Sequence, residues 1–250
     1  MNNSEYLTNS PKNIFQVAIR LNYKHEAVQE SINKMLDKNP TWKYKIFTEK
    51  SEIDEFMYKN FSQSSDKFEN KIFETYKEIP NLINYPPKLG KLIAQLDLFR
   101  VAAVYLYGGL YLDIDSELTG DFNQFLKSDA VFFLTNTAEI FNACFYSVPK
   151  HAMLKKILET INENILVHKQ GNLYAATGPS VHTHIAQELF DFEIVNYKKI
   201  IKKPLEFNGS SLYYDDANSE SLSLKIEAPF KPLLYSQNGE NFNRHWHGRF

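Results

Sequence analysis

An apolar run from Leu92 to Tyr107 leads through Gly108-Gly109 into the segment LYLDID, and this order constrains the fold more than any other feature of the chain. The run is apolar on most sides, which predicts a buried helix, and a glycine pair is typical of a helix C-terminus. The next apolar residues predict a buried strand that leads into Asp113 and Asp115. Because carboxylates have no packing role in a core, the segment predicts a functional site at the end of a strand.

The two aspartates are typical of a metal site. If the strand extends through LYLDID, Tyr111, Asp113 and Asp115 leave the sheet on one side, at the carboxyl end, where open α/β sheets bind ligands. Two adjacent carboxylates repel each other unless a cation lies beside them, and their oxygens are the ligands that Mg²⁺ or Mn²⁺ prefers. The structural alternative is that the aspartates merely start a turn, as any bare D-x-D can.

The predicted helix carries two charges, Asp97 and Arg100, three residues apart on one face. Charges inside such an apolar segment are paired or functional. A structural ion pair and a substrate contact therefore both stay open for these residues.

Periodicity places this segment in an α/β fold. Strands are predicted at 13–21, 43–49, 110–115 and 130–134, and helices at 25–39, 51–61, 92–107 and 151–165. Strands separated by helices of this length favour a parallel sheet. The polar segment 62–71 is predicted to be a surface connection.

Composition narrows the class of protein. A chain of 250 residues with 43% hydrophobic residues can form one large domain, with or without a small appendage. The net charge of -2 argues against nucleic-acid binding. The single cysteine, Cys144, excludes an internal disulfide framework and suits a reducing cytosol. We see no secretory signal and no apolar stretch of membrane-spanning length, so we expect a soluble, cytoplasmic protein, with peripheral membrane contact left open.

The segment AQLDLFRVAAVYLYGGLYLDID resembles the sugar-nucleotide-binding core of glycosyltransferase family 32, which includes capsular polysaccharide and Och1-type transferases. The clostridial glucosylating toxins share the pattern, roughly S-D-x-x-R, an apolar helix and G-G-x-Y-x-D-x-D. The chain has Leu96 in place of Ser and keeps Asp97, Arg100, Gly108, Gly109, Tyr111, Asp113 and Asp115.

Weaker similarities flank this core. Near the N-terminus Pro11, Lys12, Ile14 and Gln16 match the family, whereas Phe15 and Ala18 replace His and Trp. Further similarities are Asn142, the Gly178-Pro179 loop, and His245 and Trp246 in RHWHGRF, where Arg249 and Phe250 replace the closing Ser-Trp.

The resemblance implies one GT-A-type domain over 1–250, with a central, mostly parallel mixed sheet flanked by helices. It implies that the tail, from about 229 to 250, folds back over the active site. The implied activity is metal-dependent transfer of a sugar from a nucleotide diphosphate, with retention of anomeric configuration.

The resemblance also implies roles for individual residues. The implied catalytic residues are Asp97, Arg100 and Asp113. The implied metal ligands, for Mn²⁺ or Mg²⁺, are Asp113, Asp115 and His245. The implied donor-binding residues are Gln16, Asp97, Arg100, Tyr111, Asp113, Asn142, Gly178, Pro179 and Trp246.

A UDP-sugar is the favoured donor, with a GDP-sugar as the alternative, and the acceptor is a glycan, a glycolipid or a protein. We expect a role in bacterial surface polysaccharide synthesis, in the cytoplasm at the inner membrane face. A toxin-like role that modifies a host protein stays open.

Two other hypotheses use the same residues. A haloacid-dehalogenase-like phosphatase also has an apolar strand followed by D-x-D, with Asp215-Asp216 as a late acidic pair. That hypothesis leaves Asp97 and Arg100 without a role and has Glu117 where a Thr or Val is usual. The second hypothesis is a non-catalytic nucleotide-sugar-binding protein on a decayed transferase fold.

His182 and His184 either face an acceptor or have a capping or surface role.

Overall fold

The computed structural model describes residues 11–83, 89–118, 120–134, 139–190, 205–207, 210–214 and 224–225. The helices are α2 (Glu26–Lys38), α3 (Lys50–Phe61), α4 (Lys67–Leu82), α5 (Leu89–Tyr107), the 3-10 helix η1 (Phe122–Lys127), α6 (Ala152–Asn162), the π-helix η2 (Glu163–Val167), α7 (Leu173–Ala176) and α8 (Pro179–Phe190). The strands are β1 (Asn13–Val17), β2 (Lys43–Phe47), β3 (Gly109–Leu112), β4 (Glu117–Leu118), β5 (Ala130–Leu134), β6 (Ile140–Ser147), β7 (Leu205–Phe207), β8 (Ser210–Tyr214) and β9 (Leu224–Lys225).

A seven-stranded mixed sheet organises the molecule, in the order β2-β1-β3-β6-β5-β8-β7, and β4 pairs with β9 separately. Within the large sheet β1 is parallel to β2 and β3, and β5 is parallel to β8, whereas β3 and β5 are antiparallel to β6 and β7 is antiparallel to β8. The predicted α/β fold with a mixed sheet is confirmed, and among the described strands of the large sheet three pairings are parallel and three are antiparallel.

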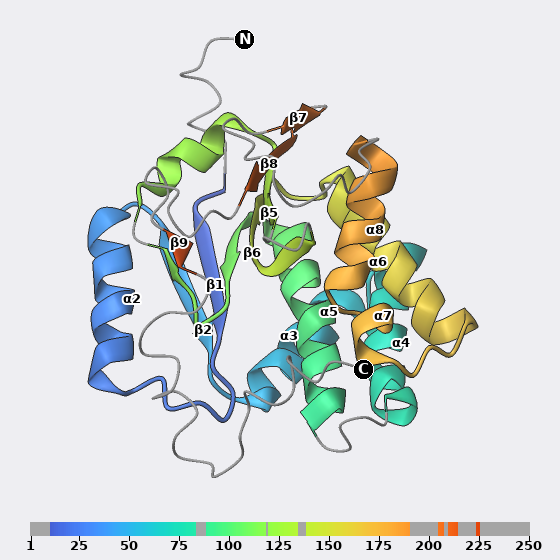
Figure 1. Cartoon of the computed structure of the whole chain (residues 1–250). Coiled ribbons are helices and arrows are strands. Elements are labelled where there is room, and N and C mark those ends of the chain that lie inside the picture. The colour runs from blue at the N-terminus through green and yellow to red at the C-terminus, as the bar shows by residue number, and fades with distance from the viewer. Residues whose placement is uncertain are drawn as a thin grey trace.

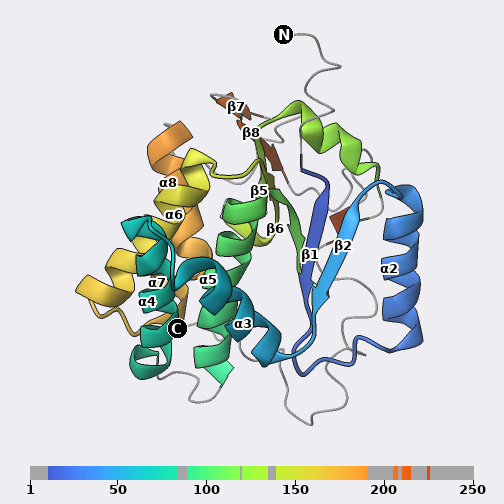
Figure 2. The ribbon, with the colours of Figure 1, turned by 180° about the vertical axis from the view of Figure 1, so that it is seen from behind.

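The two faces of the sheet are covered unequally. Figures 1 and 2 show α2 on one side and the helices α4, α5, α6 and α8 gathered on the other. Strand alternation follows this division, because Phe15 and Tyr111 belong to the core on the α5 side, whereas Ile14 and Leu110 belong to the core on the α2 side. Helix α5 lies against the sheet and is apolar on most sides because its neighbours α4 and α6 cover it as well.

The glycine pair joins α5 to β3 as the sequence predicts. Gly108 has φ +62°, and its N–H donates to the carbonyl of Val104 at 2.8 Å, which ends the helix. Gly109 has φ +116°, and a Cβ there would lie 2.5 Å from the main-chain oxygen of Asn13 in β1. Both positions therefore require glycine, and β3 enters the sheet directly beside β1.

Two local predictions are wrong. The segment 62–71 is not merely a surface connection, because α4 begins at Lys67 with the Asp66 side chain accepting from the Phe68 N–H. The strand predicted over 110–115 ends at Leu112, and the chain turns there.

None of the helices in the described ranges is long and apolar enough to span a membrane.

Candidate sugar-nucleotide site

Helix α5 places Asp97 and Arg100 inside the protein. The side chain of Asp97 is fully buried, and that of Arg100 is 6% exposed. The Nη2 atom of Arg100 lies 3.1 Å from Oδ1 of Asp97, one helical turn earlier. The two charges are therefore paired, as the sequence predicts for charges in an apolar helix.

The guanidinium group of Arg100 joins the helix to the end of β3. Its Nη1 atom lies 3.2 Å from Oδ1 of Asp113 and donates to the main-chain oxygen of Asn142 at 3.1 Å. Its Cζ atom lies 4.9 Å from the ring centroid of Tyr111, and the Tyr111 hydroxyl donates to Oδ1 of Asp113 at 2.7 Å. One cation thus holds two carboxylates from different elements beside an aromatic ring.

Asp97 has two further partners. The amide of Asn142, on β6, donates to Oδ1 at 3.3 Å, and the hydroxyl of Thr177 donates to Oδ2 at 3.2 Å. Thr177 is fully buried and precedes the predicted Gly178-Pro179 loop, where α7 gives way to α8. Sequence reasoning missed Thr177, although its position next to Gly-Pro was a signal that could have identified it.

Main-chain contacts with α7 fix the turn at Gly178-Pro179. The N–H groups of Thr177 and Gly178 both donate to the carbonyl of Leu173 at 3.2 Å. A Cβ on Gly178 would lie 2.9 Å from the main-chain oxygen of Tyr174. Glycine here lets the chain turn tightly into α8 and presents the Thr177 side chain to Asp97.

Burial shifts the protonation of the cluster. Burial raises the pKa of Asp97 to about 7, with Asp113 adding to the shift and the Arg100 charge opposing it. Burial also raises the pKa of Asp113. The Arg100 charge opposes this shift, and the nearby carboxylate of Asp115 adds to it. Burial alone would lower the pKa of Arg100, but the charges of Asp113 and Asp97 raise it, so Arg100 stays a cation.

Asp113 and Asp115 lie on a turn. The N–H of Asp113 donates to the carbonyl of Ala143 at 2.7 Å, and the N–H of Ser116 donates to the carbonyl of Asp113 at 3.0 Å. The strand is shorter than predicted, because it ends at Leu112. The predicted alternation still holds as far as Ile114, since Leu110, Leu112 and Ile114 lie in the core on the α2 side, whereas Tyr111 and Asp113 contact Arg100 on the α5 side. The site is still at the carboxyl end of β3, and the side chain of Asp113 is 28% exposed.

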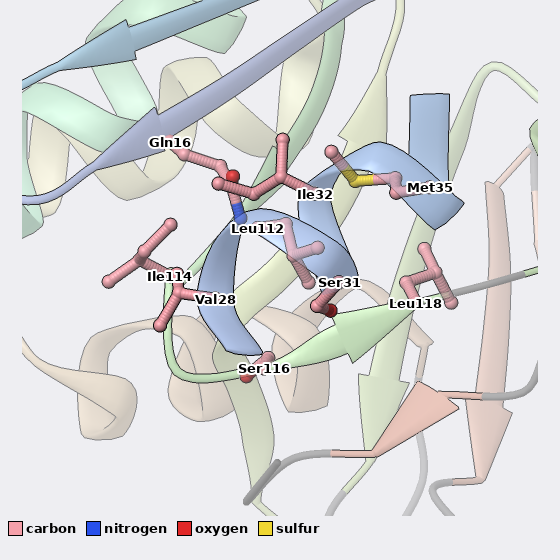
Figure 3. A pocket seen from close by; sticks show the side chains of 9 residues that line it. All are labelled: Gln16, Val28, Ser31, Ile32, Met35, Leu112, Ile114, Ser116 and Leu118. Atoms are coloured by element: carbon pink, nitrogen blue, oxygen red, sulfur yellow. The ribbon is translucent and has the colours of Figure 1, made fainter. Parts of the chain in front are cut away.

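Gln16 lies apart from this cluster. It points to the α2 side of the sheet, where its Oε1 accepts from the Tyr44 hydroxyl at 2.8 Å. Figure 3 shows its amide at a small cavity beneath the turn, lined also by Ser31, Ile114 and Ser116. The cavity volume, about 10 Å³, is near the minimum that holds one water molecule.

The predicted metal ligands are only partly described. His245 and Trp246 lie outside the described residues. Within the described ranges no group of three or more His, Cys, Asp or Glu side chains could hold a metal ion. The Asp113 and Asp115 carboxylates themselves suit Mg²⁺ or Mn²⁺, because both are hard oxygen ligands and Asp113 is partly open to solvent.

The two predicted histidines of α8 differ. His184 is exposed, and its Nε2 lies 3.1 Å from Oε1 of Glu188, which fits a surface role. His182 is fully buried beside Phe145, and neither ring nitrogen has a hydrogen-bond partner among the described residues. Burial and the nearby Arg100 charge lower its pKa to about 3, so it is neutral at physiological pH.

The fold is similar to that of a solved glycosyltransferase structure. PaToxG Glycosyltransferase superposes with a TM-score of 0.50 at 17% sequence identity, over 72% of this chain and 69% of that chain. At this identity the likeness concerns the fold, and it supports the GT-A-like arrangement predicted from the sequence.

Sequence comparisons connect the cluster with glycosyltransferases. A mannosyl phosphorylinositol ceramide synthase, SUR1 of Saccharomyces cerevisiae, is 28% identical over 147 residues, which are 57% of this chain and 34% of that protein. The chain thus spans about a third of the length of this curated relative. The family model described as "Glycosyltransferase sugar-binding region containing DXD motif" matches residues 25–132, a segment that contains Asp97, Arg100, Tyr111, Asp113 and Asp115. Over this segment the chain is similar to glycosyltransferases whose sugar-binding region contains a DXD motif.

Proposed function

We propose that the protein is a metal-dependent, retaining glycosyltransferase that moves a sugar from a nucleotide diphosphate to a glycan or glycolipid. The observation that carries this proposal is the buried contact of Arg100 with both Asp97 and Asp113, next to the D-x-D turn. A sugar nucleotide presents hydroxyls and phosphate oxygens, which a set of buried carboxylates and a guanidinium group can bind from both sides.

Asp113 and Asp115 are the proposed metal ligands, with His245 as a third. A bound Mn²⁺ or Mg²⁺ would offset the negative charge that develops on the departing diphosphate. Asp113 already accepts hydrogen bonds from Tyr111 and Arg100, which fix its carboxylate in place. Asp115 lies farther along the turn, and we assign it the more direct contact with the ion.

The proposed donor contacts follow from the cluster. Arg100 stays charged and is aimed by its two carboxylate partners, so it can approach the phosphate while Asp97 accepts from sugar hydroxyls. Asn142 shares Oδ1 of Asp97 with Arg100, and Thr177 donates to Oδ2, so the carboxyl group is held at both oxygens. Tyr111, the Gly178-Pro179 loop and Trp246 complete the proposed donor pocket, whereas Gln16 supports the strand from the other face of the sheet.

The remaining proposals concern the donor, the acceptor and the cellular location of the enzyme. A UDP-sugar remains the favoured donor and a GDP-sugar the alternative. The name of the yeast relative, a mannosyl phosphorylinositol ceramide synthase, favours a lipid-linked acceptor and places mannose among the sugars to screen. We propose a role in bacterial surface glycan assembly, in the cytoplasm at the inner membrane face.

Ligand-dependent thermal stability tests donor and metal together. The chain is melted with UDP, GDP, CMP and their sugar conjugates, each with and without Mn²⁺. A ligand at about a hundred times its Kd stabilises the native state by roughly 2.7 kcal/mol. We expect one nucleotide to raise the melting temperature only when Mn²⁺ is present, and Asp115→Ala to abolish the shift. A shift that is the same without metal, or no shift with any nucleotide, would contradict the proposal.

A further inference from the structure

A groove on the edge of the sheet lies away from the D-x-D turn. It has a volume of about 430 Å³, within the range of roughly 300–1,000 Å³ usual for small-molecule sites. Its walls come from β1, β2, α3 and the end of α5. The lining residues are Asn13, Phe15, Lys45, Phe47, Glu52, Glu55, Phe56, Lys59, Asn60 and Tyr107.

The groove is separate from the donor cluster. Tyr107 follows Asp97 by ten residues on the same helix, which corresponds to about 15 Å along the helix axis. Asn13 begins β1, whereas the D-x-D turn follows the carboxyl end of the parallel strand β3. A ligand in the groove would therefore contact side chains that the proposed donor site does not use.

An exposed aromatic ring with a fixed orientation forms one wall. Tyr107 is 45% exposed, yet its hydroxyl donates to Oδ1 of Asn60 at 2.7 Å. The Asn60 amide in turn donates to the main-chain oxygen of Phe56 at 2.8 Å, and the Phe56 ring packs 5.9 Å from the Tyr107 ring. The Tyr107 ring is thus held in place before any ligand binds, which lowers the entropic cost of binding.

The charged residues of the groove balance each other. Lys45 pairs with Glu52 at 3.3 Å. Glu55 and Lys59 lie one turn apart on α3, both exposed, and within the described residues neither has an ion-pair or hydrogen-bond partner. The groove therefore offers a free acceptor and a free donor beside an aromatic ring, with no net charge.

These features favour a neutral, hydroxyl-rich ligand. An anion would meet the carboxylates of Glu52 and Glu55, and a purely apolar ligand would leave Glu55 and Lys59 without partners. A sugar ring has an apolar C–H face that can pack on Tyr107, and hydroxyls that donate to Glu55 and accept from Lys59. We propose that this groove is a saccharide-binding site.

The role of such a site would be to hold a glycan acceptor away from the reacting centre. That role rests on the transferase activity proposed above, whereas saccharide binding itself does not. The two proposals can therefore fail independently.

Binding of neutral trisaccharides to the full chain tests the groove. Mannotriose, maltotriose and cellotriose are titrated by calorimetry and by saturation-transfer NMR, without nucleotide or metal. We expect saturable binding of at least one probe, weakened about tenfold or more by Tyr107→Ala and by Glu55→Ala. Tyr58→Ala is the matched control, because Tyr58 is a 54% exposed tyrosine on α3 that does not line the groove.

The outcomes separate the two sites. Glu55→Ala alters an exposed side chain, so its effect is informative even if Tyr107→Ala lowers stability. Retained binding in Asp115→Asn supports the groove, whereas binding lost in Asp115→Asn would assign the saccharide to the donor site and overturn the proposal. Equal losses in Tyr58→Ala and Tyr107→Ala, or no saturable binding of any probe, would also overturn it.

Discussion

Arg100 is the residue on which the buried charges of the site depend. It is the cation that contacts both Asp97 and Asp113, and each of these carboxyl groups has a pKa raised by burial. Without the guanidinium group, the fully buried Asp97 and the partly exposed Asp113 would have only neutral partners, and removing the partner of a buried charge typically costs several kcal/mol. The same group faces Tyr111 and a main-chain carbonyl, so Lys could not replace its geometry.

Asp97 gives the protein a measurable pH dependence. Its pKa rises from an ordinary value of 3.8 to about 7 in the folded chain. Between about pH 4 and 7 the folded state therefore binds a proton that the unfolded state lacks. The contribution of this group to stability falls as pH rises through that window, by up to ~1.4 kcal/mol per pH unit.

Urea unfolding of wild type and Asp97→Asn across this window measures the effect. We expect the free energy of unfolding of wild type, minus that of the variant, to decrease steadily with rising pH. His182 acts in the opposite direction, because its lowered pKa leaves the unfolded state with the extra proton below pH 6.5, but it is present in both proteins. A difference that does not vary with pH would contradict the assignment.

At the scale of elements, the site depends on how β3 enters the sheet. The path from α5 to β3 passes through two glycines with positive φ, directly beside Pro11 and Asn13 of the first strand region. This sharp connection lets residues of the helix and residues of the following turn meet in one cluster, although Arg100 and Asp113 are thirteen residues apart.

Gly109→Ala is expected to destabilise the protein strongly. Its φ of +116° is strained for any residue with a Cβ, and that Cβ would press on the main chain of β1. Strain of about 1–3 kcal/mol and overpacking of about 1–3 kcal/mol predict a combined loss of roughly 2–6 kcal/mol in the free energy of unfolding. Thermal or urea unfolding measures it.

Gly171→Ala is the matched control for this prediction. A Cβ on Gly171 would meet its nearest atom, the main-chain oxygen of Leu82, at an ordinary 3.5 Å. We expect a change below about 1 kcal/mol. Equal effects at the two positions would show that the geometry of the helix-to-strand connection does not limit stability.

At the scale of the whole molecule, the sequence predicted those features that are determined by residues close together in the chain. The Asp97–Arg100 pair lies within one helical turn, and the glycine pair ends its own helix, so both followed from the sequence. Helix α4 was missed because its first turn is polar, while its buried residues Ile72, Tyr76 and Ile79 lie farther along.

Contacts between distant segments were harder to predict. Thr177 contacts Asp97 across eighty residues, and the neighbouring Gly-Pro could have marked Thr177 as a site residue without identifying Asp97 as its partner. Strand β6 received no strand assignment because both of its faces are buried, so the alternation that marks a half-exposed strand is absent. Gln16 was placed with the donor by resemblance, although strand alternation puts it on the face opposite Tyr111.

Turnover of a nucleotide sugar tests the central claim most directly. Release of nucleoside diphosphate from UDP- and GDP-sugars is measured with and without Mn²⁺, for wild type, Asp115→Asn and Glu117→Gln. Glu117 is a carboxylate two residues beyond the D-x-D motif and serves as the control. We expect metal-dependent release by wild type and Glu117→Gln, and a loss of about 10²-fold or more in Asp115→Asn, the scale found when a charge-stabilising group is removed. Binding of the nucleotide sugar without any release would indicate a non-catalytic binding protein, and release of inorganic phosphate from phosphate esters would indicate a phosphatase; either result would contradict the transferase.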